Sequence, residues 1–213
     1  MNKATAQFLL VFVCVAVLAV PASAASSQIT APLEFSGGQD GSLNDGGSIT
    51  FTFSVTQSGT IQDVDLQLAM DHEYLEDLVV TLESPNGTSV EILTNFYDDE
   101  AILDDATFDD DVTTQIGSET SPFEGTYRVH DYDSATNTLD LFDDEDAQGT
   151  WNLTIEDECS GDTGTVYRPG NSEGYDGTKL IVTIPEPATV GMVVVGAGVL
   201  AMFARRRRSR RRV

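Results

Sequence analysis

Residues 49–56 read Ile-Thr-Phe-Thr-Phe-Ser-Val-Thr, an alternation of apolar and polar side chains with a period of two. Successive side chains of a β-strand point to opposite faces, so this stretch predicts a strand with one buried face and one polar face. Similar alternation recurs at 64–70, 78–82, 151–155 and 180–184. Because helical periodicity is scarce between these stretches, the sequence predicts an all-β domain.

The connections between the strands carry turn residues. Ser84-Pro85-Asn86-Gly87 follows one strand, and Val90 and Ile92 come next as its expected hairpin partner. The stretch 28–47 is polar and rich in glycine, and we expect it to run along an edge of the domain. Residues 168–177 are expected to form a polar loop. Short strands joined by such loops favour a β-sandwich.

The N-terminus reads as a secretory signal. Lys3 supplies a positive start, residues 8–20 form an apolar core, and Pro21 and Ala22-Ser23-Ala24 provide a cleavage site. We therefore predict a signal peptide over residues 1–24 and export through the Sec pathway.

The C-terminus contains a second apolar run. Ala188 to Ala204 has Thr189 as its only polar side chain. As a helix it would span roughly 25 Å, close to the lower limit for crossing a bilayer. The arginines that follow would hold the tail on the cytoplasmic side. This run is predicted to be a single transmembrane helix and the chain's only contact with a membrane.

Three parts of this terminus resemble the PEP-CTERM sorting signal of Gram-negative bacteria. These parts are a Pro-Glu-Pro triplet, the glycine-containing apolar run and an arginine cluster, with the sorting residues Pro185, Glu186, Pro187, Arg205, Arg206, Arg207 and Arg208. The resemblance implies that a membrane enzyme, exosortase, recognises residues 185–213 and releases the protein to the cell surface or extracellular polymer. The alternative is a permanent single-span anchor.

The charge between these ends is strongly negative. Residues 25–184 contain 34 acidic side chains against three basic ones, Arg128, Arg168 and Lys179, which leaves a formal charge of −31. Nucleic acids are excluded as partners because phosphate binding needs clustered Lys and Arg. Two interpretations remain open: a solvated acidic surface, or specific cation sites among the carboxylates.

Three stretches resemble the P domain, or Homo B domain, which accompanies the catalytic domain of proprotein convertases and kexin-like subtilases. The first is Asp77–Thr88, an Asp-Leu strand that runs into Ser-Pro-x-Gly-Thr. The second combines Thr107–Asp111 with Pro122–Tyr127, and the third combines Gly149–Asp157 with the Gly-Asp-x-Gly turn at 161–164. The resemblance implies an eight-stranded, jelly-roll-like β-sandwich.

One departure puts the last strand's register in doubt. The family usually has a Trp soon after the Gly-Asp-x-Gly turn, whereas here a loop intervenes and the next strand lacks Trp. The chain is thus predicted to comprise four segments: a signal peptide (1–24), an acidic, glycine-rich linker and edge (25–47), a P-domain-like sandwich (48–184) and the sorting signal (185–213).

The residues offer no convincing catalytic centre. A hydroxyl nucleophile needs a base, and His72 and His130 are the only histidines. Asp71 and Glu73 flank His72 and favour its protonated form, which cannot act as a base. The family resemblance implies a structural hydrogen bond for His72. Cys159 is the only cysteine outside the signal segment, and we expect it to be buried.

Calcium binding is the better hypothesis for the acidic loops. Calcium takes about six to eight oxygen ligands from carboxylates and carbonyls, and acidic residues gather at 104–111, 143–146 and 157–162. The resemblance also implies calcium, since bacterial P domains often bind it. The candidate ligands are Asp77, Asp109, Asp110, Asp157 and Asp162, and the first four named are expected to surround one ion together.

These features favour an exported, non-catalytic and calcium-stabilised module that acts by adhesion or protein contact. One alternative is a carbohydrate-binding surface protein that meets extracellular polysaccharide. Another is an accessory domain that assists a secreted subtilisin-like protease in trans. The segments that supply a subtilase's Asp, His and Ser are not found in the sequence, so a serine endopeptidase label would be inherited from the family, and we expect no enzyme.

Overall fold

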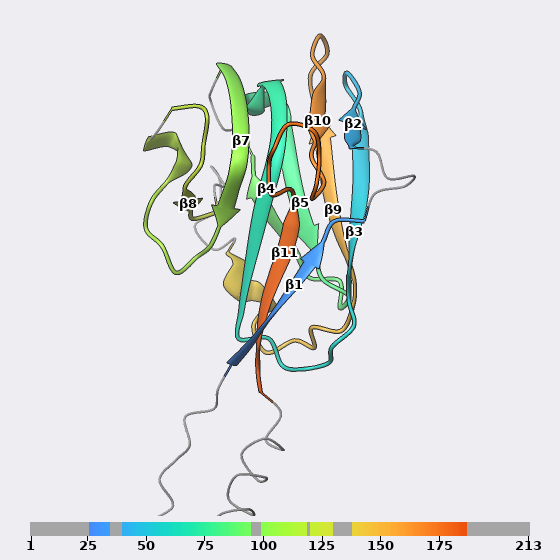
Figure 1. Ribbon diagram of the computed structural model, residues 1–213, viewed down its shortest axis with the longest axis vertical. Helices are drawn as coiled ribbons and strands as arrows, with labels where there is room; N and C mark the ends of the chain where they lie inside the picture. The colour runs from blue at the N-terminus through green and yellow to red at the C-terminus, as the bar shows by residue number, and fades with distance from the viewer. Residues whose placement is uncertain (1–25, 35–39, 95–98, 119, 130–137, 187–213) are drawn as a thin grey trace, which may run out of the picture. The chain divides into compact units, whose positions relative to one another are not determined.

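The computed structural model describes residues 26–186, apart from 35–39, 95–98, 119 and 130–137 (Figure 1). In these residues the regular structure consists of β-strands and three short 3-10 turns, η2 (Leu75–Asp77), η3 (Ile116–Ser118) and η4 (Leu139–Phe142). The strands form two sheets, in agreement with the predicted all-β sandwich.

The larger sheet is organised around one long strand, β4 (Asp63–Tyr74). On one side β4 pairs with β7, and on the other side it pairs first with β11 and then with β10 (Figure 1). Strand β1 pairs with β11, β2 pairs with β10, and β8 lies parallel to β7. The strands that join β4 in this sheet are β1 (Ser26–Pro32), β2 (Gly41–Leu43), β7 (Asp99–Phe108), β8 (Thr126–Tyr127), β10 (Gly164–Val166) and β11 (Lys179–Pro185).

The smaller sheet has four antiparallel strands in the order β3-β9-β5-β6. Its members are β3 (Ser48–Val55), β5 (Leu78–Glu83), β6 (Ser89–Leu93) and β9 (Gly149–Asp157). Apolar side chains on alternate positions of both sheets form one buried cluster, with Leu66 and Leu68 from β4 and Leu153 and Ile155 from β9 among its members. The two sheets therefore share one core, as in a sandwich.

Trp151 anchors this core near the start of β9. Its side chain is fully buried, and its ring makes an edge contact with Phe142 of η4, with 5.0 Å between the ring centroids. The indole Nε1 donates a hydrogen bond to the carbonyl oxygen of Ala147 at 3.1 Å. The indole's one polar group is thus satisfied, so the large apolar ring is buried without an unpaired donor.

The β5–β6 turn is held by a carboxylate from a distant part of the chain. Glu145 accepts hydrogen bonds from the Ser84 hydroxyl, the Asn86 amide and the Thr88 hydroxyl. Burial alone would raise the pKa of Glu145, but these three donors outweigh it and keep the pKa below its usual value. The Ser-Pro-x-Gly-Thr motif therefore supplies the donors that bind this turn to the loop before β9.

The strands predicted from alternation are confirmed, including the β5–β6 hairpin and the last strand, whose register is now defined by pairing between β1 and β4. Residues 28–47 were expected to be a linker that runs along an edge; they contain most of β1 and all of β2, the two end strands in the order of the larger sheet. One expectation needs correction. The family resemblance implied eight strands, whereas the described residues form eleven, of which β2, β8 and β10 have three residues or fewer.

Strand β7 was also missed, because its burial does not follow a period of two. Leu103, Ala106 and Phe108 are buried, and the spacing changes where the β4–β7 register shifts between Leu68 and Met70. Asp105 lies at this irregularity with φ 55°, a left-handed conformation typical of a bulge. Asp104 and Asp105, expected in an acidic loop, are therefore strand residues.

Strand β11 ends at Pro185, the first residue of the Pro-Glu-Pro triplet. Proline has no backbone N–H to donate to a neighbouring strand, so the triplet suits the end of a strand. No helix in the described part of the chain is long and apolar enough to cross a bilayer. The predicted signal peptide and C-terminal helix lie outside the described residues.

Candidate metal centre

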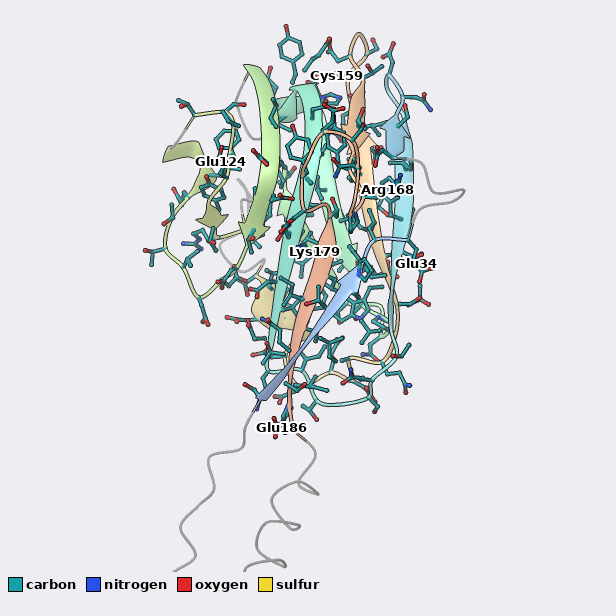
Figure 2. The ribbon with its side chains drawn as sticks, viewed as in Figure 1. Glu34, Glu124, Cys159, Arg168, Lys179 and Glu186 are labelled. Carbon is teal, nitrogen blue, oxygen red and sulfur yellow. The ribbon has the colours of Figure 1, made fainter. Side chains whose placement is uncertain are left out.

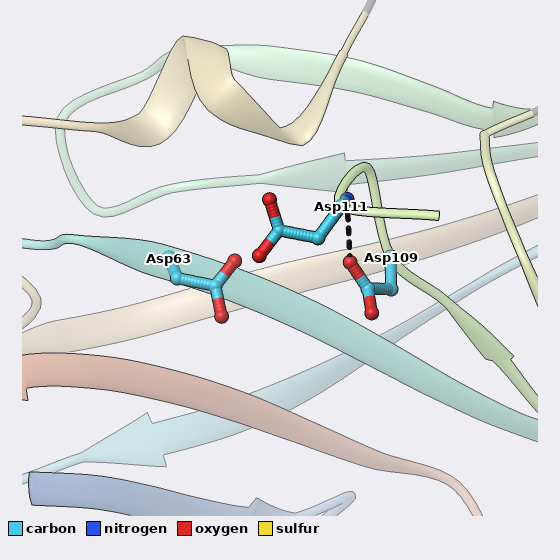
Figure 3. Close-up of side chains that lie close together, drawn as sticks. All are labelled: Asp63, Asp109 and Asp111. Carbon is cyan, nitrogen blue, oxygen red and sulfur yellow. Dashed lines mark hydrogen bonds between the residues drawn. The ribbon is translucent and has the colours of Figure 1, made fainter. Parts of the chain in front are cut away.

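Three carboxylates meet where β4 begins and β7 ends. Asp63 is the first residue of β4, and Asp109 and Asp111 follow β7 directly. Pairing of Leu66 with Phe108 brings these two strand ends side by side. One carboxylate oxygen from each aspartate lies within 4.8 Å of the others (Figure 3). The backbone N–H of Asp111 donates to Asp109 Oδ1 at 2.7 Å, which fixes the turn between them (Figure 3).

The electrostatics of this cluster oppose ionisation. Burial raises the pKa of Asp63, and the charges of Asp109, Asp111 and Asp143 raise it further. Asp65, two residues along the same face of β4, is half-buried. Burial first, and then the charges of four acids, raise its pKa to about 7; these acids are Asp63, Asp109, Asp111 and Asp110. Among the described residues, the charges that raise the pKa of both groups are all negative.

Asp65 also has an unsatisfied atom. Its Oδ1 is buried and has no hydrogen-bond partner among the described residues. The basic side chains Arg168 and Lys179 are engaged elsewhere, Arg168 with Asp40 at 3.6 Å and Lys179 with Asp176 at 3.4 Å. Burying a carboxylate without a donor or a counter-charge is costly.

Other carboxylates of the same sheet are satisfied by protein donors. Asp71 accepts from the backbone N–H of Thr165 at 2.9 Å and from the Tyr167 hydroxyl at 2.7 Å. Asp105 accepts from the backbone N–H of Asp176 at 2.7 Å and of Gly177 at 2.9 Å. The Asp63 cluster differs from these sites because three carboxylates lie close together there, and the charges that raise the pKa of Asp63 are all negative. Its donor set, carboxylate oxygens on a strand end and a turn, fits a hard divalent cation such as Ca²⁺.

The structure divides the five predicted calcium ligands between two ends of β4. Asp109 belongs to the Asp63 cluster. Asp110 lies beside it, but its Oδ2 accepts a hydrogen bond from the backbone N–H of Leu139. Burial raises the pKa of Asp110 despite that bond. Asp110 therefore ties η4 to the turn after β7, and it is not one of the three carboxylates that lie together.

Asp77 and Asp157 lie at the opposite end. Asp157 pairs with Leu78 in the smaller sheet and contacts His72 near the end of β4. His72 is six residues along β4 from Leu66, about 20 Å at the usual rise per residue. Asp162 lies between β9 and β10 at this same end, since β10 pairs with His72 through Gly164. The structure thus does not bring Asp77, Asp109, Asp110 and Asp157 around one point.

Sequence reasoning missed Asp63 and Asp65 as site residues. Both alternate with the apolar positions of β4, which marks them only as the polar face of a strand. Their closeness to Asp109 depends on β7, the strand that the alternation did not reveal. Asp143 also acts on this cluster, because its charge raises the pKa of Asp63. Burial raises the pKa of Asp143 itself, and nearby acids that include Asp111 raise it further.

Two other acids of the 143–146 loop, Glu145 and Asp146, accept hydrogen bonds that fix the local structure. Asp146 accepts from the Ser58 hydroxyl at 2.9 Å and from the backbone N–H groups of Gly59 and Gln148. The bonds from Gln148, Ser58 and Gly59 keep the pKa of Asp146 below its usual value. This carboxylate therefore fixes a loop, as Glu145 does.

Two further residues were singled out in the sequence. His72 Nδ1 lies 2.8 Å from the carbonyl oxygen of Tyr74, which confirms its structural hydrogen bond. Cys159 was expected to be buried, and this is wrong: its side chain is exposed in the loop after β9 (Figure 2). A hydrogen bond with Asp77, together with burial and nearby acids, raises the pKa of the Cys159 thiol. His130 lies outside the described residues.

Comparison with known proteins gives two family matches. Residues 61–168 match the model of the proprotein convertase P-domain, and residues 183–208 match the model of the PEP-CTERM protein-sorting motif. The first match contains β4 through β10, and thus Asp63, Asp109 and Asp111. No curated protein matches the chain.

Two similar solved structures come from Aeromonas sobria. One is its serine protease in complex with a chaperone, with 17% identity and a TM-score of 0.47; the match covers 76% of this chain and 28% of that one. The other is the serine protease of the same organism, with 20% identity and a TM-score of 0.43; the match covers 75% of this chain and 27% of that one. The chain thus spans just over a quarter of each of these structures.

Proposed function

Because the chain belongs to the proprotein convertase P-domain family, we propose that it is an exported, non-catalytic P-domain module that acts by adhesion or protein contact. P domains are accessory domains, and the sorting motif in the same chain gives this one a destination of its own. The pairing of these two matches in one chain is the observation that carries the proposal.

The proposal assigns a role to each part of the chain. Residues 1–24 act as a signal peptide, and 25–184 form the working part, a jelly-roll-like sandwich whose first segment supplies edge strands. Residues 185–213 form the sorting signal. Exosortase cuts this signal at the inner membrane, and the module passes to the cell surface or extracellular polymer of a Gram-negative bacterium.

Mass spectrometry of the full chain, produced in a bacterium with an exosortase, tests this sorting. We expect a released protein that begins at Ala25 and lacks the apolar run and the arginines. A matched strain without the exosortase, and the variant Glu186→Ala with Pro187→Ala, should retain the protein in the membrane fraction. Full-length protein in the membranes of both strains would contradict the proposal.

We also propose that calcium stabilises the module at the Asp63 cluster. Asp63, Asp109 and Asp111 would hold the ion with one oxygen each, and water or main-chain carbonyls would complete its shell. The bound ion would supply the positive charge that the raised pKa values of Asp63 and Asp65 indicate is missing. Support comes from the contrast with Asp71, whose oxygens already have protein donors.

Titration calorimetry and thermal melting with Ca²⁺ test this role. We expect heat of binding and a higher melting temperature for the wild type, and neither for Asp109→Asn. Glu158→Gln, an exposed acid beyond the far end of β9, removes the same charge and should bind calcium as the wild type does. Equal responses of the two variants would show general screening of an acidic surface and would refute a specific site.

The ligand of the module can be sought with the calcium-loaded protein. Contact with a surface protein predicts a partner captured from the producing bacterium's envelope by crosslinking. Binding to an array of bacterial polysaccharides would favour the carbohydrate-binding alternative instead. A longer active lifetime for a co-secreted subtilisin-like protease would favour the accessory role in trans.

A further inference from the structure

The loop between β10 and β11 has no part in the sorting signal or the candidate metal centre. This loop, residues 167–178, is named the strap, and its ends are joined by a hydrogen bond from the Thr178 N–H to the Tyr167 carbonyl oxygen at 2.9 Å. The match to the P-domain family ends at residue 168, so nearly all of the strap lies beyond it. The strap is therefore a feature of this chain that the family match does not account for.

The strap is held across the outer face of β4. The Tyr167 N–H donates to the Ala69 carbonyl oxygen at 2.8 Å, and the Ala69 N–H donates to Thr178 Oγ1 at 3.1 Å. At its far side the strap reaches β7, where two of its backbone N–H groups donate to the carboxylate of Asp105. The strap thus starts beside β10, crosses β4 to β7 and returns to β11 (Figure 1).

Asn171 fixes the strap from within. Its Nδ2 donates to the carbonyl oxygens of Arg168 at 2.7 Å and Tyr175 at 2.9 Å. Its Oδ1 accepts from the backbone N–H groups of Glu173 at 3.0 Å and Gly174 at 2.9 Å. One side chain therefore uses all of its hydrogen-bonding positions to set the shape of the loop. A loop that is ordered in advance reduces the entropy that binding a partner would cost.

Two tyrosines stack on each other at the strap. The rings of Tyr167 and Tyr175 have centroids 4.6 Å apart and are tilted by 42°. Tyr167 is nearly buried and its hydroxyl donates to Asp71, whereas Tyr175 is partly exposed. Ile102 of β7 pairs directly with Asp71, so its side chain lies on the same face, and it is 36% exposed. An aromatic ring and an aliphatic side chain are thus presented to solvent on one face.

Negative charge surrounds Tyr175. Burial raises the pKa of its hydroxyl, and the charges of four acids raise it further; these acids are Asp104, Asp71, Glu173 and Asp105. The basic side chains at either end of the strap, Arg168 and Lys179, already pair with other acids. A positively charged group is therefore the partner that this face favours. Among basic side chains arginine suits it best, because its planar guanidinium stacks on aromatic rings and binds carboxylates through paired hydrogen bonds.

We propose that the face formed by Tyr175, Ile102 and Asp104 docks an arginine-bearing segment of a partner protein. The guanidinium stacks on the exposed part of the Tyr175 ring and bonds to the Asp104 carboxylate. An apolar residue beside the arginine packs on Ile102. Acidic side chains are frequent throughout this domain, and the two apolar side chains beside them distinguish this face from a solvated acidic surface. This docking rests on the proposed protein contact, and it specifies the face used and the chemistry of the partner.

A chemical-shift titration of the purified full chain tests the site. The probe is a capped six-residue peptide of alternating arginine and leucine, added in about 0.15 M salt so that distant charges are screened. We expect the largest shifts at Tyr175, Ile102 and Asp104. The same peptide with neutral citrulline in place of arginine should bind about tenfold more weakly, because the cation–π contact and the ion pair are both lost. Equal affinity for the two peptides, or shifts spread evenly over the acidic surface, would overturn the proposal.

Three variants locate the contact. Tyr175→Leu and Asp104→Asn should each weaken binding of the arginine peptide about threefold, because the first loses the ring and the second loses the charge. Asp104→Asn preserves the size of the side chain, so its effect does not depend on a change in the strap. Glu156→Gln is the matched control, since it removes one negative charge from an exposed position on β9 in the other sheet and should bind as the wild type does. Equal weakening by Glu156→Gln and Asp104→Asn would show general attraction and refute the site.

The outcomes also separate this site from the proposed function. Peptide binding at Tyr175 by a protein that both strains retain in their membranes would support the docking face and contradict the sorted module. An envelope partner crosslinked to another face would refute the docking face and leave protein contact standing. Shifts at Tyr175 with a neutral oligosaccharide, and none with the arginine peptide, would refute the proposal and assign this face to carbohydrate.

Discussion

Asp65→Asn should stabilise the calcium-free protein at alkaline pH and leave it unchanged in acid. Asn keeps the shape of the side chain and cannot ionise. The pKa of Asp65 is about 7 in the folded protein, against 3.8 for a free side chain. The folded state therefore holds its proton to higher pH than the unfolded state does. Wild-type stability accordingly falls as the pH rises from about 4 to about 7, and the variant lacks that fall.

The magnitude follows from the size of the pKa difference. A full difference of this kind corresponds to about 4 kcal/mol. Asp65 is only half-buried and its neighbours share the repulsion, so solvent screening reduces the expected gain to about 1–2 kcal/mol. At an m-value of about 2 kcal/mol/M, the urea midpoint of the variant should be higher by about 0.5–1 M at pH 8.

Urea unfolding in EDTA, at pH 4 and pH 8, provides the assay. Asp71→Asn is the control, since the carboxylate of Asp71 is satisfied by Thr165 and Tyr167; this change should destabilise the protein at pH 8. The interpretation of the Asp63 cluster would be refuted if Asp65→Asn destabilised the protein at pH 8, or if its effect were the same at both pH values.

Three other predictions concern the fold. Glu145→Gln weakens the charge-assisted bonds to the β5–β6 turn and should lower the free energy of unfolding by about 1–3 kcal/mol; no change in the urea midpoint would contradict this role. Trp151→Ala removes a fully buried ring and should cost about 3–5 kcal/mol, measured in the same way, whereas a loss below 1 kcal/mol would contradict its core position. Cys159 should react with a thiol reagent in the native protein, more slowly than a free thiol because its pKa is raised; complete protection until unfolding would show that it is buried.

Much of the sandwich could be predicted from alternation alone. Strands β3, β5 and β9 bury every second residue over most of their length, so the sequence pattern and the burial pattern agree. Strand β7 could not be found in this way, because a bulge opposite Leu68 and Met70 changes which residues face the core. Strand β1 was hidden by polar residues and Pro32, which an edge strand tolerates.

Calcium binding remains a prediction, and the sequence did not indicate which carboxylates lie together. Asp109 was among the proposed ligands, and the structure places it beside Asp63 and Asp111. Asp63 and Asp111 depended on pairing between β4 and β7, which is a long-range property of the fold. Asp157 resembles a ligand in sequence, yet its two oxygens accept hydrogen bonds from Gly46 and Cys159.

Anomalous scattering from crystals grown with calcium or a lanthanide tests the central claim most directly. A strong anomalous peak bounded by the carboxylates of Asp63, Asp109 and Asp111, absent from crystals of Asp109→Asn, is the predicted result. A peak between Asp77 and Asp157, or ions scattered over the acidic surface with none beside Asp63, would contradict it.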